Sequence, residues 1–184
     1  MSTLNPNFLQ SACDAFSEAV GGSVYFPAGK YLSGTLFLKS YVTLNLDAGA
    51  VLTGSKDLKD YPVTVSKVIS LMEIYTDKSL IYGEGLEHIA ITGQGIIDGN
   101  GASFKGAYKV RPFILRIINC KNVLVKDVTM INSPMWVQDY VACENVSIDG
   151  ITVNSRVSVN NDGIDIDGCY DVRISNCEIN TGDD

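Results

Sequence analysis

Residues 120–127, CKNVLVKD, are one copy of a repeat that decides the fold. The same order of an apolar residue or Cys, an Asn-like residue and then alternating apolar positions returns in LEHIAITG (86–93), CENVSIDG (143–150) and CYDVRISN (169–176). The copies begin 34, 23 and 26 residues apart, and the longest step contains a Gly-rich polar insertion at 100–109. Repeats of roughly 20–50 residues are typical of solenoids. A unit this short, with strands and no helix, predicts one coil of a parallel β-helix.

The alternation inside each copy predicts how the coils stack. Strands of successive coils pair at about 4.8 Å, so equivalent side chains form ladders. Two aliphatic ladders and one thiol ladder are expected, with these members: Ile89, Val123, Val146 and Val172; Ile91, Val125, Ile148 and Ile174; Cys120, Cys143 and Cys169. A fourth ladder is expected at a turn, where Asn-like side chains bond backbone groups; its members are His88, Asn122, Asn145 and Asp171. We therefore interpret His88 as structural.

The rest of the chain predicts a single domain over residues 1–184. Apolar residues at helical spacing predict one helix at 7–20, placed to cap the first end of the solenoid. Short strands and turns make up the rungs of 24–184, about six or seven at this repeat length. The sequence stops just after a turn, so we expect that C-terminal rungs are absent and that the last rung is uncapped. Its apolar cross-section and free strand edges would favour self-association.

Charge and composition exclude two classes of partner. The chain carries 14 Lys+Arg against 21 Asp+Glu, a net charge of −7, which argues against nucleic-acid binding. The sequence has no run of about 18 apolar residues, so no membrane span is expected. Residues 1–8 lack the apolar core of a signal peptide. The five cysteines do not have zinc-site spacing, and we expect reduced thiols, mostly in the core.

Three aspartates stand in two short turns near the end of the chain. Asp162 lies in NNDGIDI (160–166), and Asp183 and Asp184 lie in TGDD (181–184). Asp183 follows Asp162 by 21 residues. Apolar alternation between them predicts two short strands, so one coil would bring all three carboxylates to one edge. Clustered carboxylates with no His and few Cys nearby suit hydrolysis of an acetal more than a metal site; one group donates a proton and another activates water. The alternative is that Asp and Gly here are ordinary turn residues.

Segments spread over nearly the whole chain resemble one enzyme family. They are VYFPAGKYLSG (24–34), LFLKS (36–40), GAVL (49–52), ITGQGIIDG (91–99), RP (111–112) and NSPMW (132–136). The family is glycoside hydrolase family 28, the polygalacturonases, which are right-handed parallel β-helix enzymes. The resemblance implies an all-β, right-handed solenoid. It also implies a secreted or periplasmic enzyme, without cofactor or metal, that hydrolyses the galacturonosyl linkages of pectic polysaccharide.

The most specific matches are to the family's Asn-Thr-Asp and Asp-Asp motifs, which stand here at 160–162 and 183–184. The resemblance implies that Asp183 is the general acid. It implies that Asp162 and Asp184 activate water for an inverting displacement, and that Asn160 supports the site and binds substrate. Close like charges raise one pKa, which would keep the acid protonated. Asn161 replaces the usual Thr, a change that we expect to affect fine specificity more than chemistry.

Two further motifs of the family, Gly-His-Gly and Arg-Ile-Lys, follow its Asp-Asp pair and do not occur in this sequence. We therefore expect residues 1–184 alone to have little or no activity. A second function class stays open, a catalytically silent β-helix that binds polysaccharide or serves as a structural stalk. A lyase is a weaker third option, since it needs a Ca²⁺ cluster and an Arg base.

Other side chains are weaker candidates for the site. Trp136, the only tryptophan, is interpreted as a rung-filling aromatic residue rather than a sugar-stacking platform. Arg111 and Arg116 are the best basic candidates for contact with an acidic substrate. Asp165 and Asp167 alternate with isoleucines and are expected to point outward, either lining a groove or simply solvated.

Overall fold

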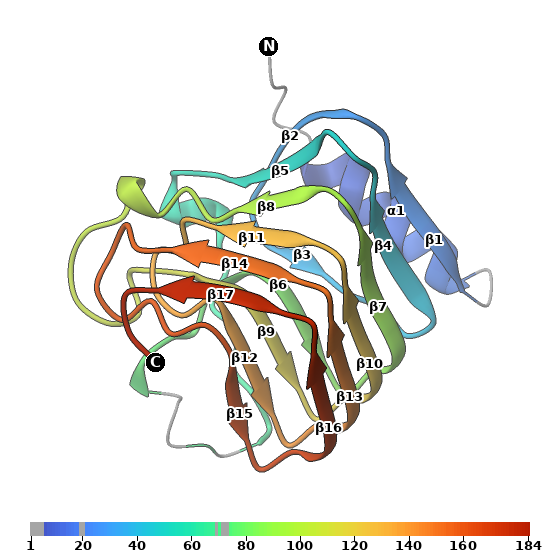
Figure 1. The fold of residues 1–184 in the computed structure, drawn as a ribbon. Coiled ribbons are helices and arrows are strands. Elements are labelled where there is room, and N and C mark those ends of the chain that lie inside the picture. The colour runs from blue at the N-terminus through green and yellow to red at the C-terminus, as the bar shows by residue number, and fades with distance from the viewer. Residues whose placement is uncertain (1–5, 19–20, 69, 71–73) are drawn as a thin grey trace.

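The chain folds as a right-handed parallel β-helix, which confirms the predicted fold class. The structure, a computed structural model, describes residues 6–18, 21–68, 70 and 74–184 (Figure 1). Consecutive strands lie in different sheets, and each strand pairs in parallel with the strand three places further along the chain. One coil therefore contributes one strand to each of three sheets.

The three sheets have six, six and five strands, which agrees with the number of rungs predicted from the repeat. Sheet I consists of β1 (Gly22–Phe26), β4 (Val42–Leu46), β7 (Glu87–Gly93), β10 (Lys121–Lys126), β13 (Glu144–Asp149) and β16 (Tyr170–Ser175). Sheet II consists of β2 (Gly29–Ser33), β5 (Ala50–Gly54), β8 (Ile96–Asp98), β11 (Thr129–Ile131), β14 (Thr152–Ser155) and β17 (Glu178–Thr181). Sheet III consists of β3 (Leu36–Phe37), β6 (Ser79–Glu84), β9 (Phe113–Ile118), β12 (Gln138–Val141) and β15 (Asp165–Asp167). The helix α1 (Pro6–Glu18) precedes them, and the 3-10 helices η1 (Leu58–Asp60) and η3 (Gly101–Ser103) lie in loops.

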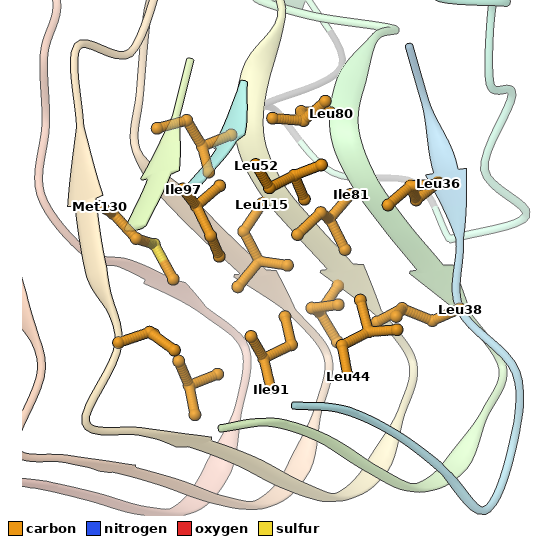
Figure 2. Close-up of a cluster of buried hydrophobic side chains, with 14 of the residues drawn as sticks. Leu36, Leu38, Leu44, Leu52, Leu80, Ile81, Ile91, Ile97, Leu115 and Met130 are labelled. Atoms are coloured by element: carbon orange, nitrogen blue, oxygen red, sulfur yellow. The ribbon is translucent and has the colours of Figure 1, made fainter. Parts of the chain in front are cut away.

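The predicted aliphatic ladders form the core. Val123 pairs in register with Ile89 and Val146, and Val146 pairs with Val172. The second ladder has the same register from Ile91 to Ile174. Figure 2 shows neighbouring side chains of this interior converging from the three sheets. Burying one such side chain stabilises the fold by about 1.5–3 kcal/mol. The five cysteines are free thiols, and Cys143 N donates to Cys169 Sγ at 3.2 Å, which places these two thiol positions on adjacent coils.

The turn ladder has a backbone conformation that explains its residue types. His88, Asn122, Asn145 and Asp171 have φ values of 53°, 56°, 54° and 56°. This left-handed region is enriched in Asn, Asp and His among residues other than glycine. Hydrogen bonds from these side chains to backbone groups were predicted. The side chains instead bond to one another, from one coil to the next. Asn145 Nδ2 donates to Asn122 Oδ1 at 2.7 Å, and Asn122 Nδ2 lies 3.2 Å from His88 Nε2.

This conformation makes a prediction at Asn145. Replacement by alanine is expected to lower the free energy of unfolding by about 1–2 kcal/mol, because a Cβ without a compensating polar group is disfavoured at positive φ. Asn145→Gly should lose clearly less, since glycine adopts this region freely. Urea denaturation of the two variants is the measurement. Equal losses would show that the side-chain bond to Asn122, and not the backbone angle, stabilises the turn.

The helix predicted at 7–20 is present as α1, and its residues 19 and 20 lie outside the described part of the chain. It packs on the first coil, against β1, β3 and β4 (Figure 1). Leu9 and Cys13 are buried in the core. Gln10 hydrogen-bonds the backbone of Phe37 on the edge strand β3. Its Oε1 accepts from Phe37 N at 2.8 Å, and its Nε2 donates to Phe37 O at 3.1 Å. The helix thus covers core and satisfies a free strand edge, the two needs of a solenoid end.

The loop between β5 and β6 covers the outer face of sheet III. Val68 packs on a cluster formed by Tyr82, Ile118 and Val141, and Lys67 N donates to Glu84 Oε1 at 2.8 Å. All six residues of β9 and all four of β12 are consequently buried. A strand buried on both faces does not alternate between apolar and polar residues. The alternation used to find strands in the sequence therefore does not detect β9 and β12.

The last coil leaves its inward side chains open. Ile166, Ile174 and Ile179 are 38%, 47% and 45% exposed. Their partners one coil earlier, Tyr140, Ile148 and Val153, are each 0% exposed. The apolar cross-section predicted for this end is therefore present among the described residues, and self-association through it stays a prediction.

Candidate active site

The three aspartates of the two motifs are carried by neighbouring loops at one edge of the solenoid. β14 and β17 pair in register, and both lead from sheet II toward sheet III. The loop 156–164 follows β14, residues 182–184 follow β17, and both lie on the left in Figure 1. Gly163 N donates to Asp184 O at 2.7 Å, which joins the two loops. The intervening chain forms three strands, β15 to β17, rather than the two that were predicted.

The backbone at Asp162 is held by one hydrogen bond and by close packing at the following residue. Its carbonyl accepts from Val137 N of the preceding coil at 2.8 Å. On the other side, a Cβ placed on Gly163 would lie 2.8 Å from Ile179 Cγ2. Such a contact is closer than carbon atoms pack, so glycine is required after Asp162 for the coils to approach. The carboxyl group is therefore presented by a backbone with little freedom.

Asn161 holds the loop from inside and does not face solvent. It is 0% exposed, and its Nδ2 donates to the carbonyls of Ser133 at 2.9 Å and Met135 at 2.8 Å. Its Oδ1 accepts from Ser158 N at 3.0 Å. A role for Asn161 in fine specificity was predicted, but this side chain acts as a structural bracket. An amide side chain suits this position, because its oxygen accepts from a backbone N–H and its NH₂ group donates to backbone carbonyls.

Asn160 is held by Arg111. Its φ is 56°, and its Oδ1 accepts from Arg111 Nη2 at 3.0 Å. Arg111 Nη1 also lies within 2.7–3.3 Å of Val159 O, Ser158 Oγ and Pro134 O. At 3% exposure, Arg111 braces the loop from below. The substrate-binding role of Asn160 stays a prediction, with its amide oxygen already committed to this arginine.

Arg116 was wrongly predicted as a contact for substrate. It is 0% exposed, and its Nε lies 3.1 Å from Oδ2 of Asp139, which is also 0% exposed. The two residues are in register on the neighbouring strands β9 and β12 of sheet III. The carboxylate of Asp139 offsets the cost of removing the guanidinium charge from water. The sequence did not reveal the pair, since its partners lie on different coils.

The crowding of carboxyl groups at this edge raises two pKa values. Burial is the main cause of a pKa of about 6 at Asp162, with smaller contributions from the charges of Asp183 and Asp184. Burial, followed by the charge of Asp162 and that of Asp139, raises the pKa of Asp165 to about 8. Near neutral pH, Asp165 thus keeps its proton while Asp162 is largely ionised. Asp165 was not among the residues selected from the family motifs.

These pKa values predict how stability depends on pH. A carboxyl group whose pKa is higher in the folded than in the unfolded state stabilises below about pH 4, and this stability is lost as the pH rises toward the folded pKa. Asp165→Asn should therefore raise the melting temperature at pH 8 and leave it nearly unchanged at pH 4. The control is Asp171→Asn, an exposed position in the turn ladder where asparagine already occupies other coils. A gain for Asp165→Asn that is equal at both pH values would contradict the assignment.

The remaining candidates lie away from the three motif aspartates or are buried. Trp136 is 8% exposed, stacks on Phe113 with a centroid distance of 5.1 Å and lies 5.2 Å from Tyr75. It is thus a packing residue, as predicted, although it packs outside the main core. His88 stands in the turn ladder of sheet I and stacks on Tyr41. Asp167 accepts from Ser70 Oγ at 2.6 Å, and so has a partner in the covering loop.

Two further features concern metals and membranes. Within residues 6–18, 21–68, 70 and 74–184, no group of three His, Cys, Asp or Glu side chains is arranged to hold a metal ion. The described helices include none that is long and apolar enough to cross a membrane.

Comparisons with known proteins identify relatives of the whole chain. Residues 18–184 match the sequence model of glycosyl hydrolases family 28. The chain is 36% identical, over 99% of its length, to a protein of Vitis vinifera described as a probable polygalacturonase. It is 27% identical over its full length to an exo-poly-alpha-D-galacturonosidase of Dickeya chrysanthemi. The matches span 40% and 39% of those two proteins, so the chain covers well under half of each relative.

A solved structure agrees with these matches. The exopolygalacturonase of Thermotoga maritima superposes with a TM-score of 0.83 at 28% identity. The match covers 97% of this chain and 49% of the Thermotoga chain.

Proposed function

This chain belongs to glycosyl hydrolases family 28, and from that premise we propose that the protein containing it hydrolyses the galacturonosyl linkages of pectic polysaccharide. The observation that carries the proposal is the joining of the 160–162 and 183–184 loops at one edge, through the bond from Gly163 N to Asp184 O. Relatives named as polygalacturonases support the choice of substrate. The comparisons favour no binding or structural role over this one.

The proposed mechanism divides the work among three carboxyl groups. Asp183 donates a proton to the leaving oxygen, because an alcohol leaves far more readily than an alkoxide. Asp162 and Asp184 accept a proton from water on the other face of the sugar. The water then attacks the anomeric carbon and inverts its configuration. Such a site needs about 6.5–9.5 Å between its acid and base to hold the water.

Asp165 has a supporting role in this scheme. It follows Asp162 in the same segment, and its raised pKa keeps it neutral near pH 7. A neutral carboxyl group adds no further repulsion to a cluster that already contains three aspartates. Asp162 can therefore ionise with a pKa of about 6, despite its burial.

The experiment uses the longer protein that contains this chain and measures its hydrolysis of polygalacturonic acid as a function of pH. Release of reducing ends gives the rate, and NMR identifies the first anomer formed. We expect kcat/KM to fall below about pH 6, because Asp162 must be ionised to activate water and its pKa is about 6. The first product should have the inverted configuration. An acid limb near the ordinary aspartate pKa of about 4 would contradict the role of Asp162. A retained configuration would contradict the mechanism, and the absence of any hydrolysis would contradict the function.

A further inference from the structure

Two buried polar side chains interrupt the apolar interior beside the aspartate loops. Gln138 and Tyr140 lie two residues apart on β12, so they point to the same side of sheet III, and each is 0% exposed. Tyr140 belongs to the main core. On the three preceding coils, the position of Gln138 is aliphatic and faces the interior (Figure 2), with Leu36, Ile81 and Leu115 as its occupants. A polar residue thus enters this ladder on the coil next to the aspartate loops.

Core packing alone does not account for these two residues. An amide or a hydroxyl group in an apolar interior lowers stability unless it is hydrogen-bonded, whereas an aliphatic side chain would simply continue the ladder. Tyr140 Oη donates to Gln138 Oε1 at 2.9 Å, and Gln138 Nε2 donates to Gly163 O at 3.3 Å. A chain of hydrogen bonds therefore runs from the core to the residue that follows Asp162.

Gly163 is the point at which the two aspartate loops are joined. Its N–H donates to Asp184 O at 2.7 Å, and the carbonyl of Asp162 in the same peptide group accepts from Val137 N at 2.8 Å. The next peptide group carries Gly163 O, the acceptor of Gln138. Val137 and Gln138 thus hold two successive peptide groups, and the first of these binds the second loop.

The local sequence explains why these peptide groups need support from outside. Glycine has more backbone freedom than any other residue, so Gly163 does not by itself keep Asp162 in one orientation. Gln138 holds it from the interior, where water does not compete for the hydrogen bond. Tyr140 donates to the amide oxygen of Gln138, which leaves the NH₂ group of that amide facing Gly163.

We propose that Gln138, oriented by Tyr140, is a positioning residue of the catalytic site. It fixes the peptide groups through which the Asp162 loop binds the 183–184 turn, and so sets the separation between the acid and the groups that activate water. The catalytic consequence rests on the proposed function. Both side chains are 0% exposed, so they act through the backbone and not by contact with substrate. A displacement of about 1 Å between reacting groups can lower a rate about 10²-fold.

The experiment uses the longer protein that contains this chain and the variant Gln138→Met, which keeps an unbranched side chain and removes the donor to Gly163 O. We expect kcat on polygalacturonate to fall about 10- to 100-fold, because the catalytic groups are displaced from one another. KM should change by less than about twofold, since the surface that binds the sugar is kept. Hydrogen exchange of residues 160–166, followed by mass spectrometry, should become faster because Gly163 is held less firmly.

A double variant separates the positioning effect from lost stability. Gln138→Met alone leaves the buried hydroxyl of Tyr140 without its acceptor, which should lower the urea midpoint of unfolding. Adding Tyr140→Phe removes that hydroxyl, so the midpoint should rise again. The kcat value should stay low, because Gly163 O still lacks its donor. Recovery of kcat together with the midpoint would overturn the proposal, since the loss would then follow from stability.

Thr35→Val is the matched control for the loss of a buried hydrogen bond. Thr35 is 8% exposed, lies between β2 and β3 on the first coil, and donates from Oγ1 to Ser79 O at 2.7 Å. Its replacement should lower the urea midpoint. It should leave kcat and the exchange of residues 160–166 unchanged, because it is remote from the aspartate loops. A fall in kcat equal to that of Gln138→Met would overturn the proposal.

The exchange measurement separates this proposal from the function on which it rests. If the parent does not hydrolyse polygalacturonate, the proposed function is refuted, and faster exchange of residues 160–166 in Gln138→Met still shows that Gln138 holds the loop. If the parent hydrolyses it, and Gln138→Met keeps either the parent's kcat or its exchange in this segment, the positioning role alone is refuted.

Discussion

In the longer protein that contains this chain, Asp183→Asn is expected to lower kcat on polygalacturonate by about 10²- to 10⁴-fold, the contribution of a positioned general acid. The leaving sugar oxygen must receive a proton as its bond breaks, and an amide cannot supply one. Asp183 stands directly after β17, beside the loop that presents Asp162, so the change leaves the core untouched. KM should change little, because asparagine keeps the shape of the side chain. Steady-state release of reducing ends measures both quantities.

The matched control for this experiment is Asp171→Asn. It makes the same chemical change on the preceding strand of the same coil, at an exposed corner of sheet I where Asn122 and Asn145 already occupy the equivalent position. We expect its kcat to equal that of the parent. If Asp183→Asn kept half of the parent's turnover, the assignment of the general acid would be wrong.

Ile148→Ala is expected to lower the free energy of unfolding by about 2–5 kcal/mol, the usual cost of removing a buried aliphatic side chain. Ile148 is 0% exposed and is stacked between Val125 and Ile174 on the neighbouring coils. Alanine would leave a cavity between two coils that paired strands hold at a set distance. The coils cannot close on it without breaking their hydrogen bonds. Urea denaturation of the purified chain measures the loss.

The comparison that tests this reasoning is Ile174→Ala, the next member of the same ladder. Its side chain is 47% exposed because it lies on the last coil, and less apolar surface is lost on truncation. Its cost should therefore be well below that of Ile148→Ala. Equal costs in the two variants would contradict the open last coil, and would mean that Ile174 is covered in solution.

The sequence by itself determined the fold and the register of its core. The repeat from 86 to 176 predicted which side chains share a ladder, and the strand pairing confirmed both aliphatic ladders. This was possible because strands one coil apart stack at a fixed spacing, so equal positions in the repeat become neighbours in space. The same spacing placed Asp162 and the 183–184 pair at one edge.

Strands β9 and β12 of sheet III could not be found in this way. β9 and β12 are buried on both faces, since the loop between β5 and β6 lies over them. The pattern of a strand reports the exposure of its two faces, and exposure here depends on a loop distant in the sequence. The pairing of Arg116 with Asp139 was hidden for the same reason.

Only the tertiary structure decided the charge state of the candidate site. Asp162, Asp165 and Asp183 look alike in the sequence, as acidic residues in or beside turns. Burial and neighbouring carboxyl groups from adjacent coils raise the pKa of Asp165 to about 8 and that of Asp162 to about 6. The two arginines are likewise distinguished by their surroundings, because Arg116 meets a carboxylate and Arg111 meets only neutral acceptors. A pKa depends on solvent access and on charges nearby in space, and spacing along the chain determines neither.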